Sequence, residues 1–136
     1  MAWNLHSREE QGMPTVTADA VPITGSADEH SPGRPTPGPA ATRPPSTLVA
    51  AGELLRALSA PVRIAIVLQL RDGERCVHEL VGALGVAQPL ISQHLRVLKS
   101  AGVVDGKRQG REVVYRLVDE HLSHIVVDAV AHVEEW

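Results

Sequence analysis

The hydrophobic positions that follow residue 46 predict two helices at the start of the folded region. Leucine and alanine recur at helical spacing over residues 47–58, and Ser46 or Thr47 can cap such a helix. Pro61 then opens a second segment, which is apolar almost throughout and reaches Asp72. We therefore predict an amphipathic first helix followed by a buried central helix.

The next pattern is typical of a helix-turn-helix. A short helix over residues 76–84 is followed by a glycine-containing break at 85–87 and a longer helix over 89–100. The longer helix has an apolar stripe, and its other face carries amide, hydroxyl and basic side chains, which read base edges and phosphates in a major groove. An ordinary polar surface is the alternative. The predicted DNA-contacting residues are Gln88, Ser92, Gln93, Arg96 and Lys99.

A β-hairpin follows this pair of helices. Two valine-containing runs flank a turn at Gln109-Gly110, where glycine tolerates a positive φ. Lys107, Arg108 and Arg111 cluster near the tip, so we predict a wing that contacts the DNA backbone. A charged edge that discourages aggregation is a compatible reading. The predicted fold is mainly α with a β-hairpin wing, a winged helix-turn-helix.

Proline divides the chain into two parts. Eight of the ten prolines come before residue 46, in a stretch without apolar periodicity that cannot bury enough surface to offset its chain entropy. We predict that residues 1–46 are a disordered tail. Residues 47–136 are then one DNA-binding and dimerisation domain, because a region of about 90 residues often gains stability by oligomerising.

Charge is distributed unevenly, although the net charge is only -3. Residues 88–117 hold six basic and two acidic residues, whereas residues 118–136 hold five acidic residues and no lysine or arginine. A basic segment of this kind indicates a polyanionic partner such as double-stranded DNA. A solvated basic face is the alternative explanation.

Composition excludes several classes of protein. The single cysteine, Cys76, rules out an internal disulfide framework and favours the cytoplasm. No apolar run approaches the ~18 residues that cross a bilayer, so we expect no membrane association. Aromatic residues are nearly absent, which argues against a base-stacking platform for single strands.

The C-terminal segment places potential metal ligands on one face of a helix. At about 100° of rotation per residue, these potential ligands form one narrow stripe along the helix. The stripe is separate from an apolar arc formed by Leu122, Ile125, Ala129, Val130 and Val133. Histidines among carboxylates are a zinc-type ligand set, whereas a solvated polar stripe is the alternative. Asp119 is placed to cap this helix. The stripe consists of His121, His124, Asp128, His132 and Glu135.

One copy of this helix cannot complete a zinc site. His121 and His132 are eleven residues apart, which is about 16 Å along a helix that rises ~1.5 Å per residue. Zinc–ligand bonds are only ~2.0–2.2 Å long. Two antiparallel copies would bring Asp119 and His121 of one chain to His132 and Glu135 of the other. We therefore predict a homodimer through its terminal helices, with two equal sites.

Residues 47–135 resemble the ArsR/SmtB family of winged-helix metal sensors. The similarity lies in residues 58–63, 76–80, 88–95 and 98–104, and in the closing pattern of Asp-x-His, ten residues, His-x-x-Glu. The resemblance implies a homodimeric repressor that binds operator DNA without metal and leaves it when zinc binds. It assigns the zinc to Asp119, His121, His132 and Glu135. His124 lies outside this set and is expected near the site or in the dimer interface.

Several alternatives remain open. Cys76 and Glu79 match a second metal site found in some members of the family, but the N-terminal arm offers His6 and His30 without a cysteine, so Cys76 is rather a buried apolar residue. A nickel or cobalt sensor of the same fold would use further histidines such as His124 or His6. A purely structural dimerisation domain is a third alternative. We do not expect an enzyme, because four protein ligands leave no open position on a zinc ion.

Overall fold

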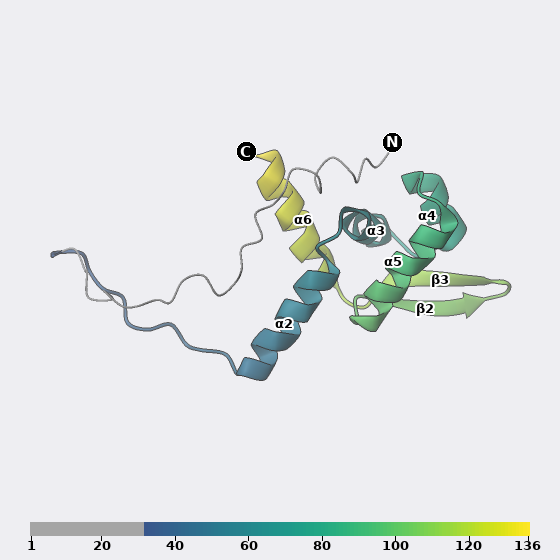
Figure 1. The fold of residues 1–136 in the computed structure, drawn as a ribbon. Coiled ribbons are helices and arrows are strands. Elements are labelled where there is room, and N and C mark those ends of the chain that lie inside the picture. The colour runs from purple at the N-terminus through teal and green to yellow at the C-terminus, as the bar shows by residue number, and fades with distance from the viewer. Residues whose placement is uncertain (1–31) are drawn as a thin grey trace. The chain divides into compact units, whose positions relative to one another are not determined.

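The computed structural model describes residues 32–136. Residues 43–136 form one compact unit, and residues 32–42, which belong to a second unit, contain neither helix nor strand. The elements in chain order (Figure 1) are α2 (Pro45–Ala57), α3 (Pro61–Arg71), β1 (Arg75–Cys76), α4 (Val77–Leu84), α5 (Gln88–Ser100), β2 (Val104–Gln109), β3 (Glu112–Leu117) and α6 (Glu120–Glu134).

Helix α3 is the centre of the core, as its continuous apolar run predicts. It begins with Pro61, ends at the C-cap Asp72, and contacts α4, α5, α6 and β3. Ile66 and Val67 are fully buried, and each such side chain contributes roughly 1.5–3 kcal/mol. Helix α3 thus positions both α5, the second helix of the predicted helix-turn-helix, and the C-terminal helix α6.

The predicted helix-turn-helix is confirmed. Gly85 ends α4 in the left-handed conformation, with φ 65°, and α5 begins at Gln88, one residue before the predicted start. The buried positions of α5 are Ile91, Leu95 and Leu98, the stripe that the sequence indicates. The opposite side of α5 is consequently exposed to solvent.

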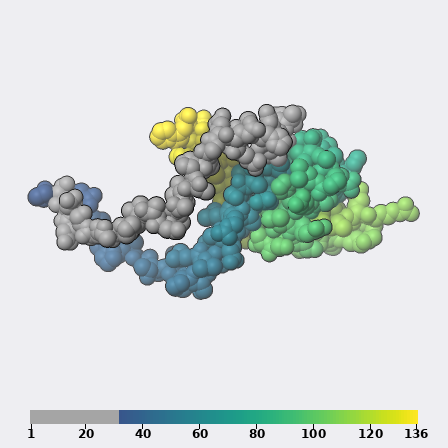
Figure 2. All heavy atoms as spheres, viewed as in Figure 1, coloured from purple at the N-terminus to yellow at the C-terminus, as the bar shows by residue number. Residues whose placement is uncertain are grey.

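The hairpin is also confirmed, and it belongs to a three-stranded antiparallel sheet of order β1-β3-β2. Gln109 pairs with Glu112, so the two turn residues are Gly110, with φ 63°, and Arg111, one position later than predicted. The strand β1 is not predicted by the sequence pattern; its two residues pair with Tyr115 and Val114 of β3, and the short helix therefore begins at Val77. The hairpin projects beyond the helices (Figure 2).

Helix α2 differs from its prediction at the first turn. It begins at Pro45, and no side chain caps it, so the expected cap by Ser46 or Thr47 is wrong. Proline at the first helical position lacks an N–H, which removes one donor that a cap would have to satisfy. The apolar side of α2 stays uncovered, with Leu48, Val49 and Leu55 exposed by 57%, 62% and 53%.

The remaining expectations concern the tail and membranes. Residues 1–31 lie outside the described residues, so the predicted disorder of the tail stays a prediction there. Residues 32–44 contain no helix or strand. Within residues 32–136, no helix has the length and apolar character that crossing a membrane requires.

Candidate metal centre and nucleic-acid interface

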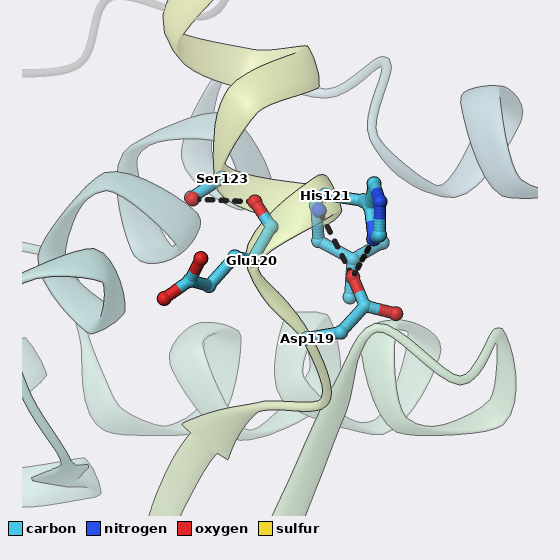
Figure 3. Close-up of polar contacts among 5 residues, drawn as sticks. Asp119, Glu120, His121 and Ser123 are labelled. Carbon is cyan, nitrogen blue, oxygen red and sulfur yellow. Dashed lines mark hydrogen bonds and ion pairs between the residues drawn. The ribbon is translucent and has the colours of Figure 1, made fainter.

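Asp119 and His121 lie together at the N-terminal end of α6. Asp119 is the N-cap, and its Oδ1 accepts a hydrogen bond from the N–H of Leu122 at 3.3 Å. The same oxygen lies 3.5 Å from Nδ1 of His121, whose side chain is 91% exposed (Figure 3). The structure therefore brings these two expected ligands together, with the imidazole in solvent.

His132 and Glu135 lie at the opposite end of the same helix. His132 is exposed in the last turn, where its ring contacts that of Trp136 with centroids 5.9 Å apart, and Glu135 is the exposed C-cap. At ~1.5 Å per residue, about 16 Å of helix separates His132 from His121 and about 21 Å separates Glu135 from it. Among residues 32–136, no three histidine, cysteine, aspartate or glutamate side chains of one chain form a group that could hold a metal ion.

The face of α6 that packs against the core differs from the predicted apolar arc. Leu122, Ser123 and Val126 are buried, and Ser123 Oγ donates to the carbonyl of Glu120 at 2.8 Å (Figure 3). Ala129 is exposed and Val133 is 70% exposed, so these two members of the apolar arc are not buried in the core of one chain. The helix is turned so that the predicted ligand stripe faces away from α3. All five stripe residues are exposed, namely His121, His124, Asp128, His132 and Glu135.

The predicted DNA-contacting surface comprises the outer side of α5 and the hairpin tip. Four of the five expected α5 residues are exposed, whereas Ser92 is half-buried. Lys107, Arg108 and Arg111 are all exposed at the hairpin tip. Arg116, lower on the hairpin, lies 3.7 Å from Asp105, so part of its charge is balanced locally. The exposed α5 residues are Gln88, Gln93, Arg96 and Lys99.

Cys76 and Glu79 begin helix α4. The N–H of Cys76 donates to Glu79 Oε1 at 3.0 Å, the arrangement of a capping box. This hydrogen bond lowers the pKa of Glu79 because it stabilises the carboxylate. The Cys76 thiol is buried and free, in line with its expected role as a small apolar residue. His6 and His30, which a second metal site would need, lie outside the described residues.

One polar contact was not foreseen from the sequence. Arg63 on α3 hydrogen-bonds through Nη1 to Nδ1 of His94 on α5, at 3.1 Å. Burial, and then the neighbouring guanidinium charge, lower the pKa of His94, which favours the neutral imidazole. Because 31 residues separate the two partners, no local pattern signals the contact.

Helix-turn-helix and wing together define a winged helix-turn-helix DNA-binding regulator. Residues 60–105 match the family model described as bacterial regulatory protein, arsR family. The HTH-type transcriptional repressor SmtB of Mycobacterium tuberculosis (strain CDC 1551 / Oshkosh) is 73% identical over 92 residues, which cover 68% of each chain. The chain therefore belongs to the arsR family of bacterial regulatory proteins, which are transcription regulators and not enzymes.

Two further comparisons support this assignment. The HTH-type transcriptional regulator NmtR of Mycobacterium tuberculosis (strain ATCC 25618 / H37Rv) is 37% identical over 110 residues, 81% of this chain and 86% of that protein. The solution structure of the homodimeric winged helix-turn-helix domain of Mb0332 from Mycobacterium bovis has a TM-score of 0.60 at 30% identity. The matched region covers 67% of this chain and 88% of the Mb0332 chain. The predicted family and fold class are thus confirmed.

The N-cap role and the charge of Asp119 predict different losses of stability for two substitutions. Asp119→Ala removes the cap of α6 and should lower the free energy of unfolding by about 1 kcal/mol. Asp119→Asn should lower it less, because an amide oxygen caps as well and only the interaction of the charge with the helix dipole is lost. Urea unfolding without metal, at one fixed protein concentration, measures both. Equal losses in the two variants would show that the carboxylate does not stabilise α6 by capping.

Proposed function

We propose that this protein is a zinc-responsive transcriptional repressor, which binds operator DNA as a metal-free homodimer and is released when zinc binds between paired α6 helices. The observation that carries the proposal is the placement of two ligand pairs at the two ends of the exposed face of α6. Imidazole and carboxylate groups are ligands that zinc takes in tetrahedral sites. Asp119 and His121 of one chain would hold it together with His132 and Glu135 of the other.

Dimerisation through the terminal helices is supported by the apolar surface that one chain leaves uncovered. Leu48, Val49 and Leu55 on α2 and Val133 on α6 are large apolar side chains that are more than half exposed. Contiguous exposed apolar surface is typical of protein interfaces. The homodimeric state of the similar Mb0332 domain is consistent with a twofold dimer here.

Operator recognition is assigned to α5 and the wing. In a winged helix-turn-helix, the second helix enters the major groove and the hairpin lies against the backbone. Gln93 and Arg96 are suited to reading base edges, and the exposed cations at the hairpin tip are suited to phosphates. A regulator of this kind acts on chromosomal DNA, so we assign it to the cytoplasm.

Regulation follows from the way that α3 connects the two surfaces. Both α6 and α5 pack on α3, so the placement of two α6 helices in a dimer also places the two recognition helices. Those helices must lie about 34 Å apart to contact successive major grooves. Bound zinc would fix the α6 pair in one arrangement. If that arrangement departs from the 34 Å spacing, operator affinity falls, and by reciprocity operator DNA weakens zinc binding by the same factor.

A nickel or cobalt sensor is the second candidate. His124 is exposed on the same stripe as His121, one turn further along α6, and it could add a ligand to a six-coordinate site. The Cys76 and Glu79 pair is a weaker candidate for a metal site, because the Glu79 carboxylate already caps α4. The choice of metal is therefore part of the test.

The wing assignment predicts a change in salt dependence. Replacing Lys107, Arg108 and Arg111 together by alanine should weaken binding to operator and non-operator duplexes alike. The slope of log affinity against log salt should fall by ~0.9 for each phosphate contact that is lost. Arg71→Ala is the matched control, since Arg71 is an exposed cation on α3, and it should leave the slope unchanged. An unaltered slope in the triple variant would exclude the wing from phosphate contact.

Operator binding followed by fluorescence anisotropy, with and without Zn²⁺, Ni²⁺ or Co²⁺, tests the proposed function. Zinc should weaken operator binding by the wild-type protein about 5- to 150-fold, the range of typical couplings. His132→Ala should bind the operator normally and lose this response. His124→Ala, the control on the same stripe, should keep the zinc response. If nickel or cobalt releases the operator, zinc does not, and His124→Ala loses this release, the protein is the nickel or cobalt sensor of the second candidate. If no metal changes operator affinity, metal sensing is refuted.

A further inference from the structure

A single arginine side chain connects three helices next to the DNA-reading surface. Arg63, in the first turn of α3, is half-buried. Its Nε donates to the carbonyl oxygen of Ala57, the last residue of α2, and its Nη1 donates to Nδ1 of His94 on α5 at 3.1 Å. The guanidinium therefore fixes the end of α2 and the middle of α5 with respect to α3.

The guanidinium of Arg63, the imidazole of His94 and the carbonyl of Ala57 determine which group donates in each hydrogen bond. A guanidinium has only donors, in a rigid planar fork, so Nδ1 of His94 must be the acceptor and the ring must be neutral. The lowered pKa of His94 agrees with that state. The carbonyl of Ala57 is one of the last four of α2, which have no partner within the helix, and a cation there also interacts favourably with the helix dipole.

The other attachments of α5 are apolar and less directional. Ile91, Leu95 and Leu98 hold α5 in the core by burial, whose individual contacts have no preferred angle, whereas a hydrogen bond fixes both the distance and the angle between two atoms. His94 directly follows Gln93, which points into solvent. A hydrogen bond at His94 thus restricts the rotation that would move the side chains of Gln93 and Arg96.

We propose that Arg63 is a positioning residue for operator recognition: through His94 it sets the orientation of α5, and through Ala57 it ties that orientation to the terminal helix α2. The inference rests on the proposed function, because it takes α5 as the recognition helix and α2 as part of the dimer. It assigns Arg63 no contact with DNA. Arg63 would determine how well α5 fits its operator and not how strongly the protein attracts phosphates.

A double-mutant cycle with Arg63→Met and His94→Leu tests the proposal, because both variants keep the bulk of the side chain but remove the bond. Operator and non-operator affinities and their salt slopes are measured for each protein. Each single variant should lose about tenfold in operator affinity. Non-operator affinity and both slopes should stay unchanged. The double variant should be no weaker than Arg63→Met, which alone already removes the bonds to both His94 and Ala57.

Two controls separate positioning from a general loss of structure. His94→Asn places an amide oxygen, at the same distance from the backbone as Nδ1, that can accept from Arg63, so it should retain most of the operator affinity. Arg56 is an exposed arginine that lines one surface groove, of about 600 Å³, together with Arg63. Arg56→Met should have no effect on operator affinity. Urea unfolding identifies any variant that is not folded at the assay temperature, and His94→Asn then decides the outcome.

The possible results have distinct meanings. A salt slope that falls by about 0.9 in Arg63→Met, with weaker binding to all duplexes, would make Arg63 a phosphate contact and overturn the proposal. Additive losses in the double variant, or an unchanged operator affinity, would also overturn it. If the wild-type protein binds no operator at all, the proposed function fails, which is a different result from failure of Arg63 alone.

Discussion

Burial of helix α3 is the constraint on which both candidate surfaces depend. Ile66 and Val67 on α3 are fully buried, and α3 packs against both α5 and α6. Close-packed interiors transmit displacements because they contain few voids that could absorb them. A movement of α6 would therefore be passed to α5, and the contacts of Arg63 with Ala57 and His94 add a directional connection to the apolar one. In the proposed dimer, this arrangement would connect the interface to the helix that reads DNA.

The second constraint is the length of α6 relative to a metal–ligand bond. One face of the helix is used for packing on α3, through Leu122 and Val126, so the ligand stripe can only face outward. The two ends of that stripe are too far apart for one ion at ~2.0–2.2 Å from each ligand. A zinc site of the proposed kind would therefore need a second chain, and metal binding would then be coupled to the geometry of a dimer.

Sequence patterns predicted those features that depend on local periodicity. The stripe of α5, the break between helices at Gly85 and the positive φ of Gly110 follow from spacing and residue type alone. Strand β1 did not, because two residues show no period and their partners in β3 are nearly 40 positions away. The buried side of α6 could not be predicted, because its apolar residues cover more than one face and only contact with α3 selects one. The hydrogen bond between Arg63 and His94 could likewise not be predicted, because the two residues are 31 positions apart and only the fold brings them together.

A mixed dimer tests the cross-chain zinc site most directly. One chain carries Asp119→Ala and His121→Ala, the other carries His132→Ala and Glu135→Ala, and two different affinity tags isolate the heterodimer. Zinc stoichiometry is then measured by titration against a competing chelator. If each site draws one pair of ligands from each chain, one site loses all four ligands while the other stays intact, so one tightly bound zinc per dimer is expected. A folded heterodimer without any tight zinc site would contradict the cross-chain account.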